Sequence, residues 1–340
     1  MLRRIIYKIK RSVQSHSRLY HFIYLLVTFN RDYIAVRLSG VRYPSRFGGL
    51  WTDKPGAEAE IQHKYARGEI TAEEMAGLQQ FRERGFLVTP RAIAEELIEQ
   101  YLNDLARLQR EDSPLLVTSI GLPEPAPYRP GIDAEYLSVR TVDDYFHIES
   151  ARRLLFAKII NRWLSLLLER PPMLTQSLNF FYGSEQALHQ DTAFVTMNSP
   201  MKFIGVWIAL EDIEEGAGEL LYIPGSHLWP DYLFSGCFKH YDAERDGLDQ
   251  LHQWYDWIQN QAAEQGNAVE KFLAKKGDVL FWHAGLVHGG APVTKPGLSR
   301  RSLVGHYCAE GVRPLYHYYK PAQRMIYTNQ DQRYTSSYYS

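Results

Sequence analysis

From Leu174 to about Tyr307 the sequence consists of short apolar runs, and this pattern constrains the fold more than any other feature. Glycine and proline separate the runs, as expected for β-strands joined by turns. The runs are LNFFYG, ALHQDTAFVTM, FIGVWIALED, GELLYIPGSH, GDVLFWHAGLVHGG and RRSLVGHY. Apolar residues at helical spacing dominate before them. Many short strands that follow a set of helices predict a mainly-β or α+β core with a helical flank.

The helices of this flank have recognisable ends. Thr71 and Glu74 form a capping box that opens one helix, and Gly85 can end it. Pro90 is tolerated in the first turn of the next helix. The apolar spacing from His147 to Arg170 predicts one long amphipathic helix.

These patterns divide the chain into four parts. We predict a basic leader at 1–50, a helical flank packed on the core at 51–170, a β core at 171–310 and a C-terminal extension at 311–340. A partly helical insertion at 231–268 interrupts the core. Insertions on a β scaffold often shape a substrate pocket, but a packed surface excursion is an equally good interpretation.

Bulk composition excludes some classes of protein. The net charge of −1 gives no general case for nucleic-acid binding. Two cysteines, Cys237 and Cys308, cannot form a disulfide framework, so a reducing, cytoplasmic setting is expected. The apolar run Tyr20–Phe29 lacks a small-residue cleavage site. It also has about half of the ~20 residues that span a bilayer.

The leader is strongly basic. Residues 1–50 contain ten Lys or Arg and one acidic residue, Asp32. Within residues 2–18, a helical wheel places apolar side chains on one side and basic ones on the other. Such a helix can lie on an anionic membrane, which would make the protein peripheral on the inner face. The alternative is a helix docked on the protein's own core.

His189 and Asp191, in the run ALHQDTAFV, are candidate metal ligands. On a strand, residues i and i+2 point the same way, so both side chains can face one site. His288 supplies a distant third ligand. Its rival is His283, and we favour His288 because it precedes a glycine pair, where backbone can approach a ligand closely. Two imidazoles and one carboxylate on one face of a metal form the triad of non-haem Fe(II) oxygenases.

Arg300 follows at the start of a later strand and suits an anionic co-substrate. The 5-carboxylate of 2-oxoglutarate needs a bidentate cation, and arginine fits that geometry better than lysine. Arg301 is the alternative candidate for binding this carboxylate. Adjacent strand residues face opposite ways, so only one of the two should point inward.

Together these runs resemble the phytanoyl-CoA dioxygenase family of Fe(II)/2-oxoglutarate-dependent oxygenases, over about residues 175–307. The resemblance implies a double-stranded β-helix, a jelly-roll-like barrel with flanking helices. It implies that His189, Asp191 and His288 bind iron and that Arg300 binds 2-oxoglutarate. Trp207 matches a tryptophan that lines the co-substrate pocket, although an ordinary core tryptophan is an equal alternative. No catalytic residue is implied beyond the metal ligands.

The sequence departs from the family at two places. Gly290 stands where the family often has a small hydroxyl residue, and the spacing from His288 to Arg300 is one residue longer than expected. The Pro224–His227 turn matches a family hallmark, which we interpret as structural.

The expected activity is hydroxylation of a C–H bond with O2 as the oxidant. Asp191 supplies a carboxylate ligand, so the position on the iron that a halide ion would take is not vacant. Hydroxylation is therefore favoured over halogenation. The sequence does not identify the substrate. A membrane-borne or lipid-linked glycan would fit the basic leader, and a soluble metabolite is the main competitor. A non-catalytic β-barrel binding protein and a cupin-like hydrolase or isomerase that uses another metal are further alternatives. The oligomeric state is not readable.

Overall fold

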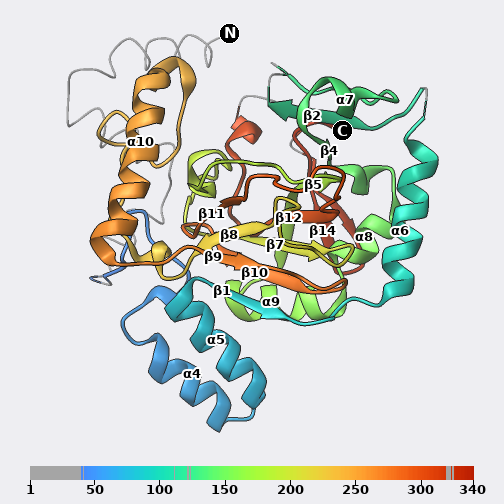
Figure 1. Ribbon diagram of the computed structural model, residues 1–340. Coiled ribbons are helices and arrows are strands. Elements are labelled where there is room, and N and C mark those ends of the chain that lie inside the picture. Colours follow the sequence, from blue (N-terminus) through green and yellow to red (C-terminus); the bar gives the residue numbers. More distant parts are fainter. Residues whose placement is uncertain are drawn as a thin grey trace.

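Two sheets of mainly antiparallel strands form the centre of the protein (Figure 1). The computed structural model describes residues 40–340 except 41, 111, 121, 123, 319–322 and 324. The larger sheet runs in the order β1-β10-β7-β12-β5-β4-β2-β3, with β14 beside β5 and β13 beside β14. The smaller sheet runs β6-β11-β8-β9. The predicted mainly-β core with a helical flank is therefore confirmed.

The larger sheet comprises β1 (Phe86–Thr89), β2 (Leu116–Ile120), β3 (Ala126–Pro127), β4 (Leu137–Val142), β5 (Pro172–Phe180), β7 (Phe203–Ala209), β10 (Val279–His283), β12 (Ser302–Ala309), β13 (Tyr327–Asn329) and β14 (Gln332–Tyr334). The smaller sheet comprises β6 (His189–Gln190), β8 (Leu220–Ile223), β9 (Glu270–Phe272) and β11 (Val287–Gly290). The helices are α4 (Ala57–Ala66), α5 (Ala72–Arg84), α6 (Glu95–Leu108), α7 (Ile132–Glu135), α8 (Glu149–Leu155), α9 (Lys158–Leu168) and α10 (Ala243–Gln265).

Strand alternation gives the large sheet two apolar faces. Leu303 and Tyr307 of β12 pack against the helices of the flank. Val304 of the same strand faces the other way, into a cluster that also contains Tyr222 of the small sheet. The two sheets therefore pack face to face, and residues 300, 302, 304 and 306 share the inner face of the larger one.

The predicted ends of α5 are confirmed. The Thr71 hydroxyl accepts a hydrogen bond from the Glu74 amide at 3.1 Å, and the Glu74 carboxylate accepts one from the Thr71 amide at 2.9 Å. Gly85 ends the helix in the left-handed region, at φ 81°, where a side chain would be strained. The prediction for Pro90 is wrong: it lies in the turn that follows β1 rather than in the first turn of a helix, because α6 begins only at Glu95.

The single long helix predicted for 147–170 is wrong. Two helices, α8 and α9, separate at Phe156, whose ψ of 24° leaves the helical region. The Asn161 side chain donates a hydrogen bond to the Phe156 carbonyl at 3.1 Å. The break lets the Phe156 ring pack edge-on against Tyr307 of β12, with ring centroids 6.2 Å apart.

The flank at 51–170 is also not purely helical. Strand β1 pairs with β10, and β4 pairs with β5, so both extend the large sheet. The C-terminal segment packs on the same sheet. The Ser336 hydroxyl donates to the buried Asp143 carboxylate, and the Tyr145 hydroxyl donates to the Thr335 carbonyl at 2.6 Å.

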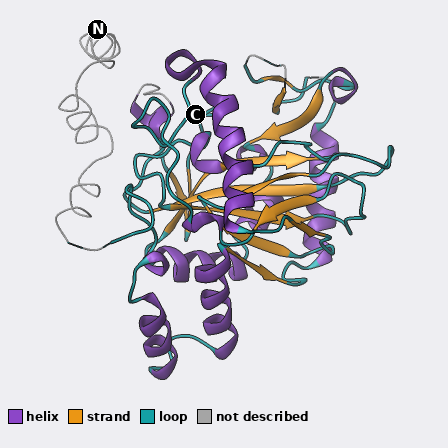
Figure 2. Cartoon of the chain, turned by 60° about the vertical axis from the view of Figure 1, so that its left-hand side comes forward, coloured by secondary structure: helices purple, strands orange, loops and turns teal. Residues whose placement is uncertain are grey.

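The insertion forms the kinked helix α10, which stands to one side of the sheets in Figure 1 and passes in front of them in the turned view of Figure 2. Its partly helical character is as predicted, and the kink falls at Gly247, at φ 67°. Among the described helices, none is long and apolar enough to cross a membrane. The predicted amphipathic helix at 2–18 lies outside the described residues, so it stays a prediction.

Candidate metal centre

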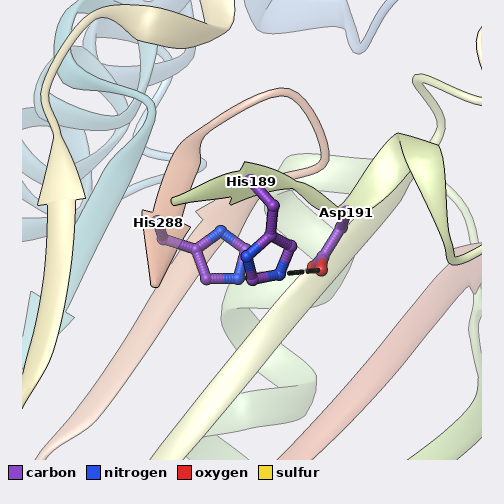
Figure 3. A group of neighbouring side chains, drawn as sticks. All are labelled: His189, Asp191 and His288. Carbon is purple, nitrogen blue, oxygen red and sulfur yellow. Dashed lines mark ion pairs between the residues drawn. The ribbon is translucent and has the colours of Figure 1, made fainter. Parts of the chain in front are cut away.

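His189, Asp191 and His288 come together on the inner face of the small sheet (Figure 3). Strands β6 and β11 are antiparallel neighbours, and His288 lies directly opposite His189 in their register. One ligand atom from each of the three residues lies within 4.8 Å of the other two. His288, although distant in sequence, therefore lies beside His189 and Asp191 because strands β6 and β11 are paired.

Asp191 does not lie on a strand. Strand β6 ends at Gln190, and Asp191 begins a 3-10 turn that extends to Ala193. Strand alternation was therefore the wrong reason for expecting residues 189 and 191 on one side. The turn nevertheless directs the carboxylate toward the His189 ring.

Backbone contacts fix the orientation of both imidazoles. His189 Nδ1 is 2.8 Å from the Ala187 carbonyl oxygen, and His288 Nδ1 is 3.0 Å from that of Leu286. A carbonyl oxygen only accepts, so each Nδ1 carries the proton and each neutral Nε2 presents a lone pair. Each Nε2 lies 3.6 Å from Asp191 Oδ1.

The charge states suit metal binding. Burial lowers the pKa of His288 to about 4, so the ring is neutral near pH 7. Burial would raise the pKa of Asp191, but the neighbouring imidazoles of His288 and His306 hold it well below its usual range. Three lone-pair donors thus converge with no proton between them. A metal cation satisfies this arrangement, and two imidazoles with one carboxylate match Fe(II).

Two residues that the sequence did not identify lie beside the other oxygen of Asp191. Trp282 Nε1 donates to Oδ2 at 2.8 Å, and His306 Nε2 lies 3.4 Å from the same atom. The Trp282 hydrogen bond leaves Oδ1 facing the imidazoles of His189 and His288. His306 is on the inner face of β12, the strand that Arg300 precedes, so counting alternate residues from Arg300 would have found it.

His283, the rival of His288, does not reach the centre. It lies at the end of β10, where its Nε2 is 3.1 Å from the carboxylate of Asp53 and its Nδ1 accepts from the Gly285 amide at 3.0 Å. His227 lies beside it, with ring centroids 5.1 Å apart, and bonds to the Arg82 carbonyl. Three of these four ring nitrogens are committed to other partners, while His227 Nδ1 has none in the described part of the chain. Among the described residues, the group that could hold a metal ion is His189, Asp191 and His288.

Arg300 is buried, whereas Arg301 is partly exposed. Burial lowers the pKa of Arg300 to about 10, and no described carboxylate forms an ion pair with it. Its Nε has no hydrogen-bond partner among the described residues, and the guanidinium carbon lies 5.4 Å from the centroid of the Phe180 ring. A buried cation without a counter-charge is costly, so this position fits an anion.

Trp207 lies on β7, opposite Val304 of β12, and its ring is buried. Its Nε1 has no partner in the described part of the chain. A buried indole usually finds a hydrogen-bond acceptor, so this orphan donor is compatible with a ligand between the sheets. The assignment of Trp207 to the co-substrate pocket stays a prediction.

Gly290 is explained by a neighbouring loop. A Cβ atom at position 290 would lie 2.8 Å from the Ser184 hydroxyl and 2.9 Å from the Glu185 amide. Any side chain at 290 therefore clashes with backbone that cannot easily move.

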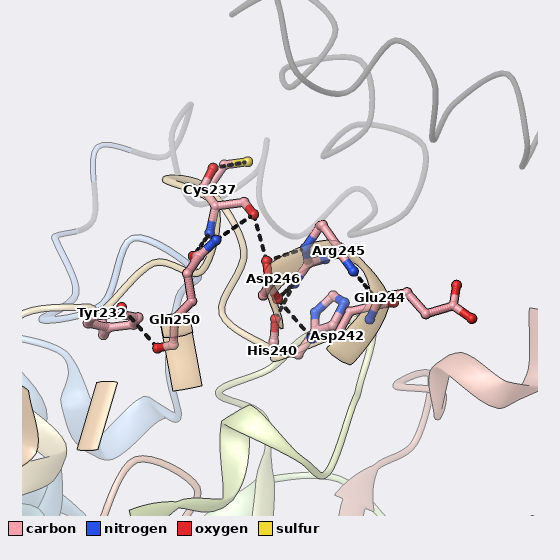
Figure 4. A network of polar contacts seen from close by, with 9 residues as sticks. Tyr232, Cys237, His240, Asp242, Glu244, Arg245, Asp246 and Gln250 are labelled. Carbon is pink, nitrogen blue, oxygen red and sulfur yellow. Dashed lines mark hydrogen bonds and ion pairs between the residues drawn. The ribbon is translucent and has the colours of Figure 1, made fainter. Parts of the chain in front are cut away.

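The insertion reaches the centre through aromatic contacts. Phe194, 41% exposed, has its ring 5.9 Å from His189 and 5.6 Å from Trp254 of α10. A polar network anchors the start of α10, where the Asp246 carboxylate accepts hydrogen bonds from Arg245 and Ser235 (Figure 4). The insertion is therefore fixed beside the metal centre.

Comparisons with known proteins agree with this geometry. The sequence profile described as Phytanoyl-CoA dioxygenase matches residues 81–302. Peroxisomal phytanoyl-CoA dioxygenases from Bos taurus and Homo sapiens are each 22% identical over 239 and 249 residues, covering 67% of this chain and 66% of theirs. The chain thus spans slightly under two thirds of the length of these relatives.

A solved structure shares the fold. The non-haem alpha ketoglutarate dependent epimerase SnoN from nogalamycin biosynthesis superposes with a TM-score of 0.53 at 20% identity, over 72% of this chain and 87% of that one. The likeness confirms the double-stranded β-helix.

Proposed function

The chain belongs to the phytanoyl-CoA dioxygenase family of Fe(II)/2-oxoglutarate-dependent oxygenases, and from that premise we propose that it hydroxylates a C–H bond of a substrate. His189, Asp191 and His288 would hold Fe(II), and Arg300 would bind the 5-carboxylate of 2-oxoglutarate. One observation carries the proposal. Three unprotonated donor atoms converge on one inner face, and a buried arginine without a counter-charge lies on the facing sheet. The three donor atoms need a cation, and the buried arginine needs an anion.

When bound, iron with 2-oxoglutarate and O2 supplies the oxidant for the C–H bond. The protein's own residues provide orientation. The Ala187 and Leu286 carbonyls hold the two imidazoles with Nε2 toward the metal position, as is usual for histidine ligands. Trp282 donates a hydrogen bond to Asp191 Oδ2, and His306 lies beside the same atom, so that Oδ1 remains for the metal. Arg300 and the unpartnered Trp207 Nε1 are placed to bind the co-substrate.

The experiment that tests this function is turnover of 2-oxoglutarate. Protein loaded anaerobically with Fe(II) is exposed to O2, and succinate is measured against a sample loaded with Zn(II). We expect slow, iron-dependent succinate formation even without the primary substrate. A protein that binds 2-oxoglutarate yet never forms succinate, even with a panel of candidate substrates, would be a binding module. Metal-dependent chemistry that ignores 2-oxoglutarate would indicate a hydrolase or isomerase.

For the substrate, we propose a membrane-borne or lipid-linked molecule such as a glycan, because the leader at 1–50 is rich in basic residues. Its basic side chains would bind the anionic inner face of the membrane. The competing substrate is a soluble metabolite, which needs no membrane contact.

Deleting residues 2–18 should abolish sedimentation with anionic vesicles. Each basic residue near such a surface contributes about 1 kcal/mol, so losing several should reduce binding more than ~100-fold. Co-sedimentation with phosphatidylglycerol vesicles, with neutral vesicles as the control, measures this. If the full chain fails to sediment, or if the deletion changes nothing, the membrane proposal is wrong.

A further inference from the structure

The turn at residues 284–286, between β10 and β11, contacts both segments that carry metal ligands. The Gln190 side chain, next to two of the ligands in sequence, donates a hydrogen bond to the Gly285 carbonyl oxygen at 2.7 Å. The Leu286 carbonyl oxygen accepts one from His288 Nδ1 at 3.0 Å. Both of these hydrogen bonds are buried. A shift of this turn would therefore move donor atoms on both sides of the metal position.

His283, the last residue of β10, fixes the conformation of the turn. Its Nδ1 accepts a hydrogen bond from the Gly285 amide at 3.0 Å, and its carbonyl oxygen accepts one from the Leu286 amide at 2.8 Å. An amide N–H only donates, so Nδ1 carries a lone pair and the proton of the ring is on Nε2. The residue is 1% exposed, so this proton needs a buried acceptor.

The carboxylate of Asp53 is that acceptor. Asp53 ends the 3-10 turn Trp51–Asp53, 230 residues before His283, and its Oδ2 lies 3.1 Å from His283 Nε2. The same oxygen accepts a hydrogen bond from the Leu50 amide at 2.8 Å, which fixes a carboxylate that is only 6% exposed. Asp53 lies outside residues 81–302, the part of the chain that matches the family profile. The segment before that region thus supplies a buried contact to the turn beside the metal centre.

We propose that Asp53 is a positioning residue for the metal centre. It holds His283 in the tautomer that binds the Gly285 amide, and the turn in its place then orients the His288 imidazole and the segment of Gln190. The inference rests on the proposed function, because it requires that a metal binds at the three converging donor atoms. Asp53 acts through His283 rather than through a contact with the metal. Partners that orient a metal ligand contribute about 10- to 100-fold in metal affinity.

Titration of the metal-free full chain with Co(II), in place of Fe(II), tests the proposal. The visible absorption of bound Co(II) reports the geometry of its ligands, and its increase during the titration gives the dissociation constant. We expect Asp53→Ala to raise this constant about tenfold and to alter the spectrum, because the Nε2 proton of His283 loses its acceptor. Asp53→Asn keeps an oxygen that can accept from His283, so it should restore the wild-type spectrum and most of the affinity.

Asp231→Ala is the matched control. Asp231 is also a buried carboxylate, and it anchors the same N-terminal segment to the loop before α10 rather than to the turn. It accepts hydrogen bonds from the Ser45 hydroxyl at 2.9 Å and the Arg46 amide at 2.8 Å. Asp231→Ala should keep the wild-type constant and spectrum, while thermal unfolding of both variants measures the cost to the fold. An equal loss of Co(II) affinity in the two variants would overturn the inference, because loosening of the segment would explain it.

The ring nitrogen resonances of His283, measured in metal-free wild-type protein labelled with 15N-histidine, give a test that needs no variant to fold. The inference requires a neutral ring with the proton on Nε2, and a proton on Nδ1 or a charged ring at neutral pH overturns it. It is also overturned if Asp53→Ala binds Co(II) like the wild type, or if Asp53→Asn loses as much affinity as Asp53→Ala. A wild-type protein that binds neither Co(II) nor Fe(II) contradicts the proposed function itself.

Discussion

Replacing His288 by alanine should abolish iron-dependent succinate formation and weaken Fe(II) binding by more than ~100-fold. Partners that only orient a metal ligand typically contribute 10- to 100-fold in affinity, so loss of a ligand should cost more. His288 supplies one of the three converging donor atoms, and the lone pairs of His189 and Asp191 would then lack the third. Anaerobic equilibrium dialysis against Fe(II) measures the affinity, and succinate formation measures turnover.

His252→Ala is the matched control, because it removes an exposed histidine of α10. It should leave both quantities unchanged. Thermal unfolding of the two variants separates loss of the site from loss of the fold. A folded His288→Ala protein that binds iron with normal affinity would show that His288 is not a ligand.

Replacing Arg300 by glutamine should raise the dissociation constant for 2-oxoglutarate by ~30-fold or more while iron binding is kept. Removing one member of a buried charge pair costs about 2–5 kcal/mol, and every 1.4 kcal/mol is tenfold in affinity. Arg300→Lys should recover only part of the loss, because an ammonium group lacks the planar fork. Titration of 2-oxoglutarate into anaerobic Fe(II)-loaded protein measures the constant.

Arg301 is the matched control for this experiment. It precedes the same strand but is partly exposed, with its guanidinium carbon 4.2 Å from the centroid of the Phe181 ring. Arg301→Gln should leave the dissociation constant within about twofold of wild type, as expected for an exposed position. The assignment of Arg300 would be wrong if Arg301→Gln produced the larger loss.

The metal centre could be predicted from the sequence because its residues lie in three short segments, each with a recognisable local pattern. His288 was favoured over His283 for the glycine pair that follows it, and the structure shows why glycine is needed. A Cβ at Gly289 would lie 2.7 Å from the Gln186 carbonyl oxygen, in the loop that leads to His189. Arg300 and Arg301 differ in burial as expected, although both precede β12 rather than lie on it.

Other parts depended on contacts between segments that are distant in sequence. Asp191 accepts a hydrogen bond from Trp282, 91 residues away, with His306, 115 residues away, beside the same oxygen, and no local pattern joins these residues. The break at Phe156 follows from packing against Tyr307, which outweighs the helical spacing of the segment.

The most direct test is anomalous diffraction at the iron absorption edge from crystals grown anaerobically with Fe(II) and 2-oxoglutarate. We expect a single strong peak within bonding distance of His189 Nε2, His288 Nε2 and Asp191 Oδ1, with the 5-carboxylate of 2-oxoglutarate at Arg300. A peak beside His227 and His283 instead, or no peak in protein that has been shown to bind iron in solution, would contradict the assignment.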